Sequence, residues 1–98
     1  MECWKKAREL TKMVYQIADK FPRDRRLIDQ ITGSGISSMN NIAEGFDSGG
    51  DNDFLRYLGY LRNSVSEIQS CLYVALDRKY INQDKFDEIT KMQRFAAN

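Results

Sequence analysis

The stretch 54-FLRYLGYLRNSVSEIQSCLYVAL-76 decides the fold of this chain. Its apolar residues recur at alternating intervals of three and four, the spacing that places them on one side of an α-helix. The predicted helix runs from about residue 52 to 78 and is about 40 Å long. The apolar positions are Phe54, Leu55, Leu58, Leu61, Val65, Ile68, Leu72, Ala75 and Leu76. A helix of this kind needs partner helices to cover its apolar side, so we expect an all-α protein.

Three further helices are predicted around this stretch, over about residues 2–20, 24–45 and 83–96. Phe21-Pro22 ends the first of them, because the residue before a proline avoids helical backbone. Asp24 is expected to cap the second helix and Asn82 the fourth, while either Asp51 or Asn52 caps the third. Helices joined by short connections give an up-down-up-down four-helix bundle, here a single domain over residues 1–98 with a short fourth helix.

The apolar side of each flanking helix follows the same spacing. The first helix has Cys3, Trp4, Ala7, Leu10, Val14, Ile17, Ala18 and Phe21; the second has Leu27, Ile28, Ile31, Ile36, Met39, Ile42, Ala43 and Phe46; the fourth has Phe86, Ile89, Met92, Gln93, Phe95 and Ala96. Because the helices have unequal lengths, the bundle is expected to leave apolar surface uncovered. Uncovered apolar surface of this kind predicts self-association.

Glycines mark two special places in the second helix. The segment Thr32-Gly33-Ser34-Gly35 forms helix poorly, at a cost of roughly 1 kcal/mol per glycine relative to alanine. The apolar spacing resumes in phase after this segment. We therefore expect small residues that let another helix approach closely, rather than a bend. Gly45 lies near the expected helix end, where left-handed backbone is favoured.

Polar residues recur on otherwise apolar sides of two helices. Ser37, Asn41 and Glu44 share one side of the second helix, and Ser64 and Glu67 share one side of the third. If these sides face each other, they form a polar seam in which a carboxylate must be hydrogen-bonded or become neutral. The main interpretation is a structural network that aligns the helices. A contact with a small ligand or partner at the bundle end is the alternative.

A third interpretation treats Glu44 and Glu67 as a pair for metal or acid–base chemistry. Helical di-metal sites add Glu-x-x-His motifs, and this chain has no histidine. We therefore predict a protein that is not an enzyme, with no catalytic residue, no metal site and no cofactor.

Basic residues gather around the first turn and on the first helix. A phosphate-binding patch here would use Lys5, Lys12, Lys20, Arg23, Arg25 and Arg26. Acidic residues alternate with them, which is also typical of an ordinary solvated surface. The formal net charge of the chain is +1, whereas dedicated nucleic-acid binders are usually strongly basic.

The remaining composition excludes several classes of protein. Cys3 and Cys71 have neither the spacing of a metal site nor that of a disulfide framework, so we expect them to be small apolar residues in a reducing compartment. No apolar run approaches the roughly 18 residues of a membrane span. The charged N-terminus is unlike a signal peptide. A cytoplasmic protein without membrane contact is predicted.

One motif identifies a resemblance. Asn41-Ile42-Ala43-Glu44-Gly45, preceded by Ser37, resembles the signature of the four-helix bundle proteins that are related to proteins encoded in 23S rRNA intervening sequences. Phe54-Leu55-x-Tyr57-Leu58 and Ser64-x-x-Glu67 resemble the third helix of that family, and Tyr80-Ile81 resembles the turn before its fourth. The resemblance covers nearly the whole chain.

The resemblance implies a bacterial, non-enzymatic protomer that assembles into a ring, typically a homopentamer with a central channel. The wider family is often described as ribosomal-protein-like. A related branch, the accessory proteins of diversity-generating retroelements, binds a reverse transcriptase and nucleic acid through such a ring. We therefore expect an oligomeric scaffold protein whose partner is another protein. The alternative is an accessory module that binds RNA or DNA through the basic patch.

Overall fold

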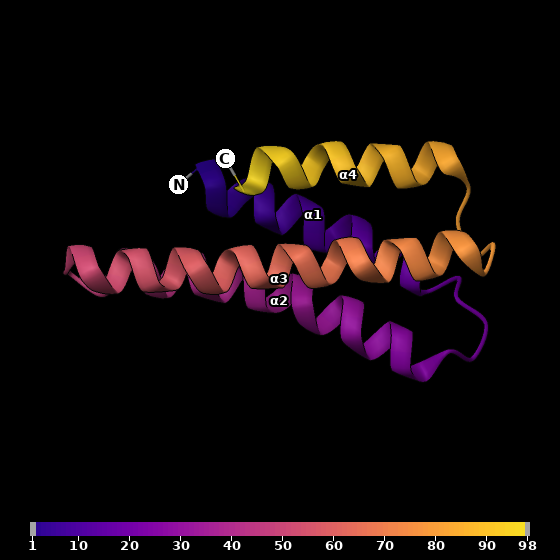
Figure 1. Cartoon of the computed structure of the whole chain (residues 1–98), viewed down its shortest axis with the longest axis horizontal. Coiled ribbons are helices and arrows are strands. Elements are labelled where there is room, and N and C mark those ends of the chain that lie inside the picture. The colour runs from indigo at the N-terminus through magenta and orange to yellow at the C-terminus, as the bar shows by residue number, and fades with distance from the viewer. Residues whose placement is uncertain (1, 98) are drawn as a thin grey trace.

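A computed structural model describes residues 2–97 of the chain, with side chains described as far as Arg94. The described residues form four helices: α1 (Glu2–Ala18), α2 (Arg25–Asp47), α3 (Asp51–Asp77) and α4 (Gln83–Ala97). Consecutive helices run in opposite directions, so the predicted up-down-up-down bundle with a short fourth helix is confirmed (Figure 1). Each helix packs on its neighbours in the chain, and α4 also packs on α1.

Two of the predicted helix caps are confirmed. The carboxylate of Asp24 accepts a hydrogen bond from the backbone N–H of Leu27 at 3.2 Å, at the start of α2. The side chain of Asn82 accepts one from the N–H of Lys85 at 2.8 Å, at the start of α4. Both side chains satisfy a donor that the first helical turn leaves without a partner.

The predicted cap of the third helix is wrong. α3 begins after Gly50, whose backbone is extended and which makes no side-chain hydrogen bond to the helix. Asp51 already belongs to the first turn, together with Asp53. Carboxylates in this position interact favourably with the positive end of the helix dipole, which explains their presence without a capping role.

The main core lies where all four helices overlap. It contains residues from every helix, together with Phe21 from the turn after α1. Its buried members are Leu10, Val14, Ile17, Ala18, Phe21, Leu27, Ile31, Ile68, Leu72, Ala75, Phe86 and Ile89. All twelve of these positions are predicted by the helical spacing. The predicted core positions Phe95 and Ala96 lie outside the described side chains.

Four predicted core positions are exposed instead. Leu55 is 64 % exposed, Phe46 52 %, and Ile36 44 %, and Leu58 is also exposed. Leu55, Leu58 and Phe46 belong to the parts of α2 and α3 that extend past the described ends of α1 and α4 (Figure 1). Ile36 points away from the bundle because its neighbours Ser34, Gly35 and Ser38 occupy the inner side of α2.

The close approach predicted at the glycine segment occurs at Gly35. A Cβ atom built on Gly35 would lie 3.2 Å from the side chain of Thr11 on α1, whereas one on Gly33 would meet nothing within 4 Å. The buried hydroxyl of Thr11 lies 2.9 Å from the carbonyl oxygen of Gly35 and 2.8 Å from that of Ala7. Small residues thus allow α1 and α2 to share a polar contact inside the bundle.

The role expected for Gly45 needs correction. Gly45 does not cap α2 but lies inside the helix and is buried. A Cβ at this position would lie 3.1 Å from the Cβ of Tyr57 on α3. The glycine is therefore needed for the close packing of two helices, and left-handed backbone appears only later, at Gly49.

Among the described residues, no helix is long and apolar enough to cross a membrane.

The two glycines of the segment provide a matched test of this packing. Gly35→Val is expected to lower the free energy of unfolding by about 2 kcal/mol, because the added methyl groups would overlap Thr11. Gly33→Val should change it by less than about 0.5 kcal/mol, because it faces open space and helix propensity changes little. Urea unfolding at one fixed protein concentration measures both. Equal effects at the two positions would contradict the packing described here.

Candidate interaction surfaces

A polar contact joins α2 and α3 at the middle of the bundle. The hydroxyl of Ser34 donates a hydrogen bond of 2.8 Å to Oε2 of Glu67. Ser34 is buried, whereas Glu67 is exposed. The polar seam expected between these two helices therefore includes Glu67, but its partner on α2 is Ser34.

The other predicted members of the seam are placed differently. Ser37 and Glu44 are exposed, Asn41 is half-buried, and Ser64 is buried one turn before Glu67. The inner side of α2 runs through small residues at helical spacing, and Ser37 and Glu44 lie outside it. The seam predicted through Ser37, Asn41 and Glu44 is thus corrected to one that runs through Ser34.

Glu44 and Glu67 do not form a carboxylate pair. Glu67 bonds to Ser34, and Glu44 follows Ser34 by ten residues, which is about 15 Å along the axis of α2. The described residues also contain no group of three or more acidic, cysteine or histidine side chains arranged to hold a metal ion. The two carboxylates are consequently too far apart to act together in chemistry.

The α2–α3 connection and the helix ends beside it extend past the described ends of α1 and α4 (Figure 1). The reason is length: α2 has 23 residues and α3 has 27, whereas α1 has 17 and α4 has 15. We call residues 43–60 the hairpin end. Two aromatic pairs lie there, Phe46 with Phe54 at a centroid distance of 5.6 Å and Tyr57 with Tyr60 at 5.7 Å.

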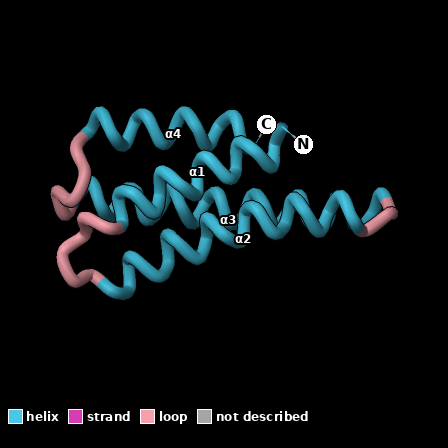
Figure 2. Tube along the Cα trace, turned by 180° about the vertical axis from the view of Figure 1, so that it is seen from behind, coloured by secondary structure: helices cyan, strands magenta, loops and turns pink. Residues whose placement is uncertain are grey.

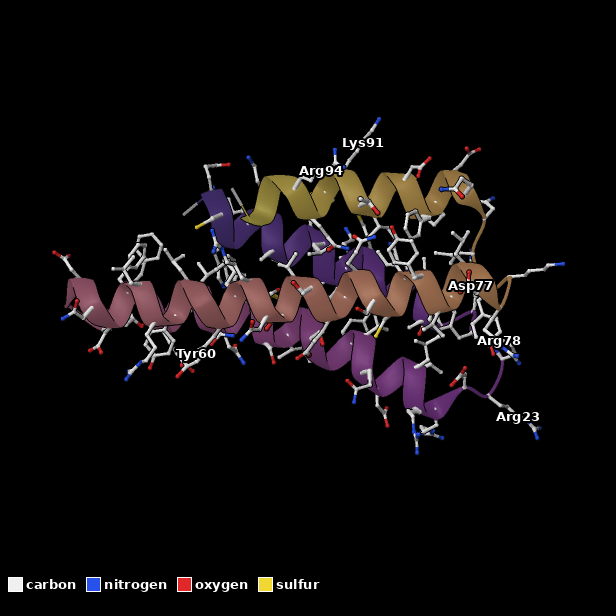
Figure 3. The ribbon with its side chains drawn as sticks, in the orientation of Figure 1. Arg23, Tyr60, Asp77, Arg78, Lys91 and Arg94 are labelled. Atoms are coloured by element: carbon white, nitrogen blue, oxygen red, sulfur yellow. The ribbon has the colours of Figure 1, made fainter. Side chains whose placement is uncertain are left out.

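The hairpin end is rich in exposed apolar side chains. Phe46, Leu55, Leu58 and Tyr60 are all exposed, and they account for half of the eight exposed large hydrophobic residues of the described chain. Tyr60 lies at this end in Figure 3. Leu55 and Leu58, three residues apart, share one side of α3, and exposed apolar residues grouped in this way are typical of an interaction surface.

The middle of α2 carries no charge on any side. Residues 30–43 contain no Asp, Glu, Lys or Arg, although charged residues make up 30 % of the chain. Several of these residues are exposed, among them Ile36 and Asn40. Depletion of charge on an exposed surface is a feature of protein–protein interfaces. We call the exposed part of residues 30–43 the uncharged side of α2, and it ends where the hairpin end begins.

Basic residues collect at the opposite end of the bundle, where the α1–α2 and α3–α4 connections lie together (Figure 2). Lys20, Arg23, Arg25 and Arg26 are exposed here, as the sequence grouping indicates. The fold adds two residues that sequence analysis did not include, Arg78 and Lys79 from the α3–α4 turn. Arg23 and Arg78 appear close to the same end in Figure 3. We call these six residues the basic end.

The two turns of the basic end are held together by aromatic contacts. The rings of Phe21 and Tyr80 lie 5.2 Å apart, and the hydroxyl of Tyr80 donates a 3.1 Å hydrogen bond to Asp24. A hydrogen bond to Tyr80 raises the pKa of the Arg78 guanidinium above its ordinary value. These contacts hold the α1–α2 and α3–α4 connections against each other, and the basic side chains project from the two connections.

Two residues of the basic end have left-handed backbone, Arg23 with a φ of 37° and Lys79 with a φ of 63°. At Lys79 the geometry ends α3: its N–H donates to the carbonyl of Leu76, and the N–H of Tyr80 donates to that of Ala75. Glycine is the usual residue at this type of helix end. A lysine there places a positive charge at the tip of the turn.

The lysines of α1 do not all join this surface. Lys5 lies at the other end of α1 from Lys20, about 22 Å away along the helix, and contacts Glu2 at 3.8 Å. Lys12 is exposed near the middle of α1. The structure thus separates the predicted patch into the basic end and isolated lysines.

Both cysteines are free thiols and half-buried. Burial raises the pKa of the Cys71 thiol, and the negative charge of Glu67 raises it further. A thiol with a raised pKa remains protonated and is a poor nucleophile near neutral pH. This agrees with the expectation that Cys71 acts as a small apolar residue.

Removal of one hydroxyl distinguishes the observed seam from the predicted one. Ser34→Ala is expected to lower the free energy of unfolding by about 1 kcal/mol, because it removes the hydrogen bond to Glu67. Ser37→Ala, on an exposed residue of the same helix, should change it by less than about 0.5 kcal/mol. Urea unfolding of both variants is the measurement. A larger loss for Ser37→Ala would favour the seam that the sequence predicted.

Comparison with known proteins identifies a family for this chain. No curated protein matches the chain. A family model described as "23S rRNA-intervening sequence protein" matches residues 1–95. The match covers nearly the whole chain, and the four-helix fold is consistent with the resemblance carried by Asn41-Ile42-Ala43-Glu44-Gly45. The chain belongs to the 23S rRNA-intervening sequence protein family.

Proposed function

We propose that this protein is a non-enzymatic scaffold that assembles with copies of itself through the hairpin end. The observation that carries the proposal is the exposed apolar cluster of Phe46, Leu55 and Leu58, which lies beyond the reach of α1 and α4. Burying this cluster against a second copy would remove apolar area from water, which is the main favourable contribution to association.

The uncharged side of α2 supports a second copy as the occupant. When two surfaces come into contact, any charged side chains between them lose their hydration, which costs free energy. Residues 30–43 have no charged side chain, so this cost does not arise there. The hairpin end and this side of α2 are adjacent but chemically different, one aromatic and the other rich in small polar residues. Two unlike surfaces that meet head to tail form a closed ring when the rotation between copies permits it. We propose a ring of five, the number that the family resemblance implies.

We also propose that the ring acts in the bacterial cytoplasm, where its partner is another protein. Two free cysteines agree with a reducing compartment.

A second function is favoured by one observation, the basic end. Lys20 and Arg23 of the α1–α2 connection, and Arg25 and Arg26 at the start of α2, lie at the same end of the bundle as Arg78 and Lys79. No side chain of Lys20, Arg23, Arg25 or Arg26 forms an ion pair within the described part of the chain. We propose as the second candidate that this end binds the phosphate backbone of RNA or DNA, with each copy of a ring adding one weak contact.

Assembly is tested by one substitution at the hairpin end. Leu55→Lys is expected to convert an assembly of about five times the 11.4 kDa chain mass into smaller species, because it places a charge in the apolar contact. Light scattering after size-exclusion chromatography measures the mass. Far-UV circular dichroism should show that the helices remain.

Val74→Lys is the matched control, since Val74 is an exposed apolar residue on α3 but lies far from the hairpin end. Its assembly should equal that of the unmodified protein. A monomer at every concentration of the unmodified protein would contradict the proposal. So would a Leu55→Lys variant that assembles normally.

Nucleic-acid binding is tested with paired charge removals. Arg25→Gln combined with Arg26→Gln should weaken binding to a 23S rRNA fragment about tenfold at roughly 50 mM salt, because each lost phosphate contact reduces affinity. Lys5→Gln combined with Lys12→Gln removes the same charge away from the basic end and should have a smaller effect. Fluorescence anisotropy of labelled RNA measures both. Absence of binding by the unmodified protein at this salt concentration would exclude the second candidate.

A further inference from the structure

One side of α3 has two exposed leucines between two charges of opposite sign. Its residues follow one another at intervals of four, three and four, which places them on the same side of the helix; they are Asp51, Leu55, Leu58 and Arg62. All four are exposed, and neither charged side chain forms an ion pair within the described residues. We call these residues the α3 row. Its charge is negative at the start of α3 and positive about 16.5 Å further along the axis.

A row with the same spacing lies on α1, and we call it the α1 row. Its residues are Arg8, Lys12, Tyr15 and Asp19, all of them exposed. Asp19 directly follows α1, and its N–H still donates to the carbonyl oxygen of Tyr15, so it continues the helical spacing. None of the three charged side chains forms an ion pair within the described residues. The positive charges come first in this row and the negative charge last, which is the reverse of the order in the α3 row.

The α1 row borders the uncharged side of α2. Thr11 lies next to this row, because it follows Arg8 by three residues and precedes Tyr15 by four. The hydroxyl of Thr11 is 2.9 Å from the carbonyl oxygen of Gly35 on α2, and the next residue, Ile36, is exposed. α4 packs on α1 and α3 but not on α2. A helix of another copy that lies against the α1 row would therefore also cover part of the uncharged side of α2.

We propose that the α3 row of one copy lies against the α1 row of the next copy, with the two helices parallel. This inference rests on the assembly proposed above and names the side chains that form its contact. The facing pairs are Asp51 with Arg8, Leu55 with Lys12, Leu58 with Tyr15, and Arg62 with Asp19. The apolar stem of a lysine can cover a leucine while its charge stays in water. Tyr15 is the one exposed large hydrophobic side chain of α1 among the described residues, and this contact covers it.

The order of the charges selects the parallel direction. Antiparallel helices would bring Asp51 to Asp19. They would also bring Arg62 to Arg8, so that like charges would meet at both ends of the contact. Exposed ion pairs add little affinity, but they fix the register of a contact and increase the rate of encounter. The affinity comes mainly from the apolar area of the leucines that is removed from water.

The α3 row also has charges that complement a second α3 row. Two such rows in antiparallel contact would bring Asp51 of each copy to Arg62 of the other. A stable specific interface buries at least about 1,000 Å² in total, and two leucines on each side supply only a small part of this area. That contact would also leave Tyr15 and the uncharged side of α2 in water. The contact between unlike rows covers all of these surfaces, so the observations favour it.

Charge reversal in pairs tests the contact. Arg8→Glu and Asp51→Arg should each raise the dissociation constant of the assembly about tenfold at roughly 50 mM salt, because each places like charges opposite one another. Both substitutions in one chain restore the attraction. The dissociation constant of this double variant should therefore return to within about threefold of the unmodified value. Light scattering over a dilution series measures the mass, and far-UV circular dichroism should show that the helices remain.

Asp53→Arg is the matched control for Asp51→Arg. It makes the same change in the same first turn of α3, but on a different side of the helix. Asp53 already pairs with Arg56 at 3.3 Å. Asp53→Arg should therefore fail to restore the assembly that Arg8→Glu weakens.

The proposal is overturned if Arg8→Glu leaves the dissociation constant unchanged. It is also overturned if Arg62→Asp restores the assembly of Asp51→Arg and Arg8→Glu does not, because this result would identify contact between two α3 rows. In both cases, loss of assembly in Leu55→Lys would still support the hairpin end as the contact. An unmodified protein that remains a monomer would overturn both the assembly and this register.

Discussion

The unequal length of the helices is the constraint on which the rest of this structure depends. An amphipathic helix needs other helices along its whole apolar side, and α1 and α4 are too short to provide them for α2 and α3. The described core consequently consists of a main cluster with residues from all four helices and a smaller one, Ala7, Ile42 and Leu61, from α1, α2 and α3. At the hairpin end only two of the described helices remain, and apolar side chains such as Leu55 stay in contact with water. The single chain therefore leaves apolar side chains exposed at this end.

The same constraint separates the two ends of the molecule chemically. The hairpin end is apolar and aromatic, and the basic end gathers positive side chains from two turns. If the hairpin end of one copy meets α2 of the next, each copy still presents its own basic end. A weak patch on one protomer would then be repeated around the assembly, where avidity increases its effect. The two functions proposed for this family member are therefore compatible with each other.

Much of the fold could be predicted from the sequence, because helical spacing and caps are local signals. Asp24 and Asn82 have the residue type and position of helix caps, and both act as such. The inner side of α2 was harder to recognise, since it is made of small residues and not of apolar ones. The run of Ser34, Gly35 and Ser38 has the same helical spacing as Ile31 and Ile42, and this spacing could have identified it.

The candidate sites were predicted only in part, for a related reason. A seam that includes Glu67 follows from local spacing, but its partner depends on how α2 is rotated, which Gly35 and Thr11 determine through contact between helices. Arg78 and Lys79 join the basic end only because the fold brings two distant turns together. None of these features is a property of a single stretch of sequence.

The central claim is that the hairpin end is the contact between copies of the chain. An experimental structure of the assembled protein tests it most directly, through the exposed fraction of Leu55. We expect Leu55, which is 64 % exposed in the single chain, to become buried against a neighbouring copy. An assembly in which Leu55 and Phe46 remain in contact with solvent while copies meet elsewhere would contradict it.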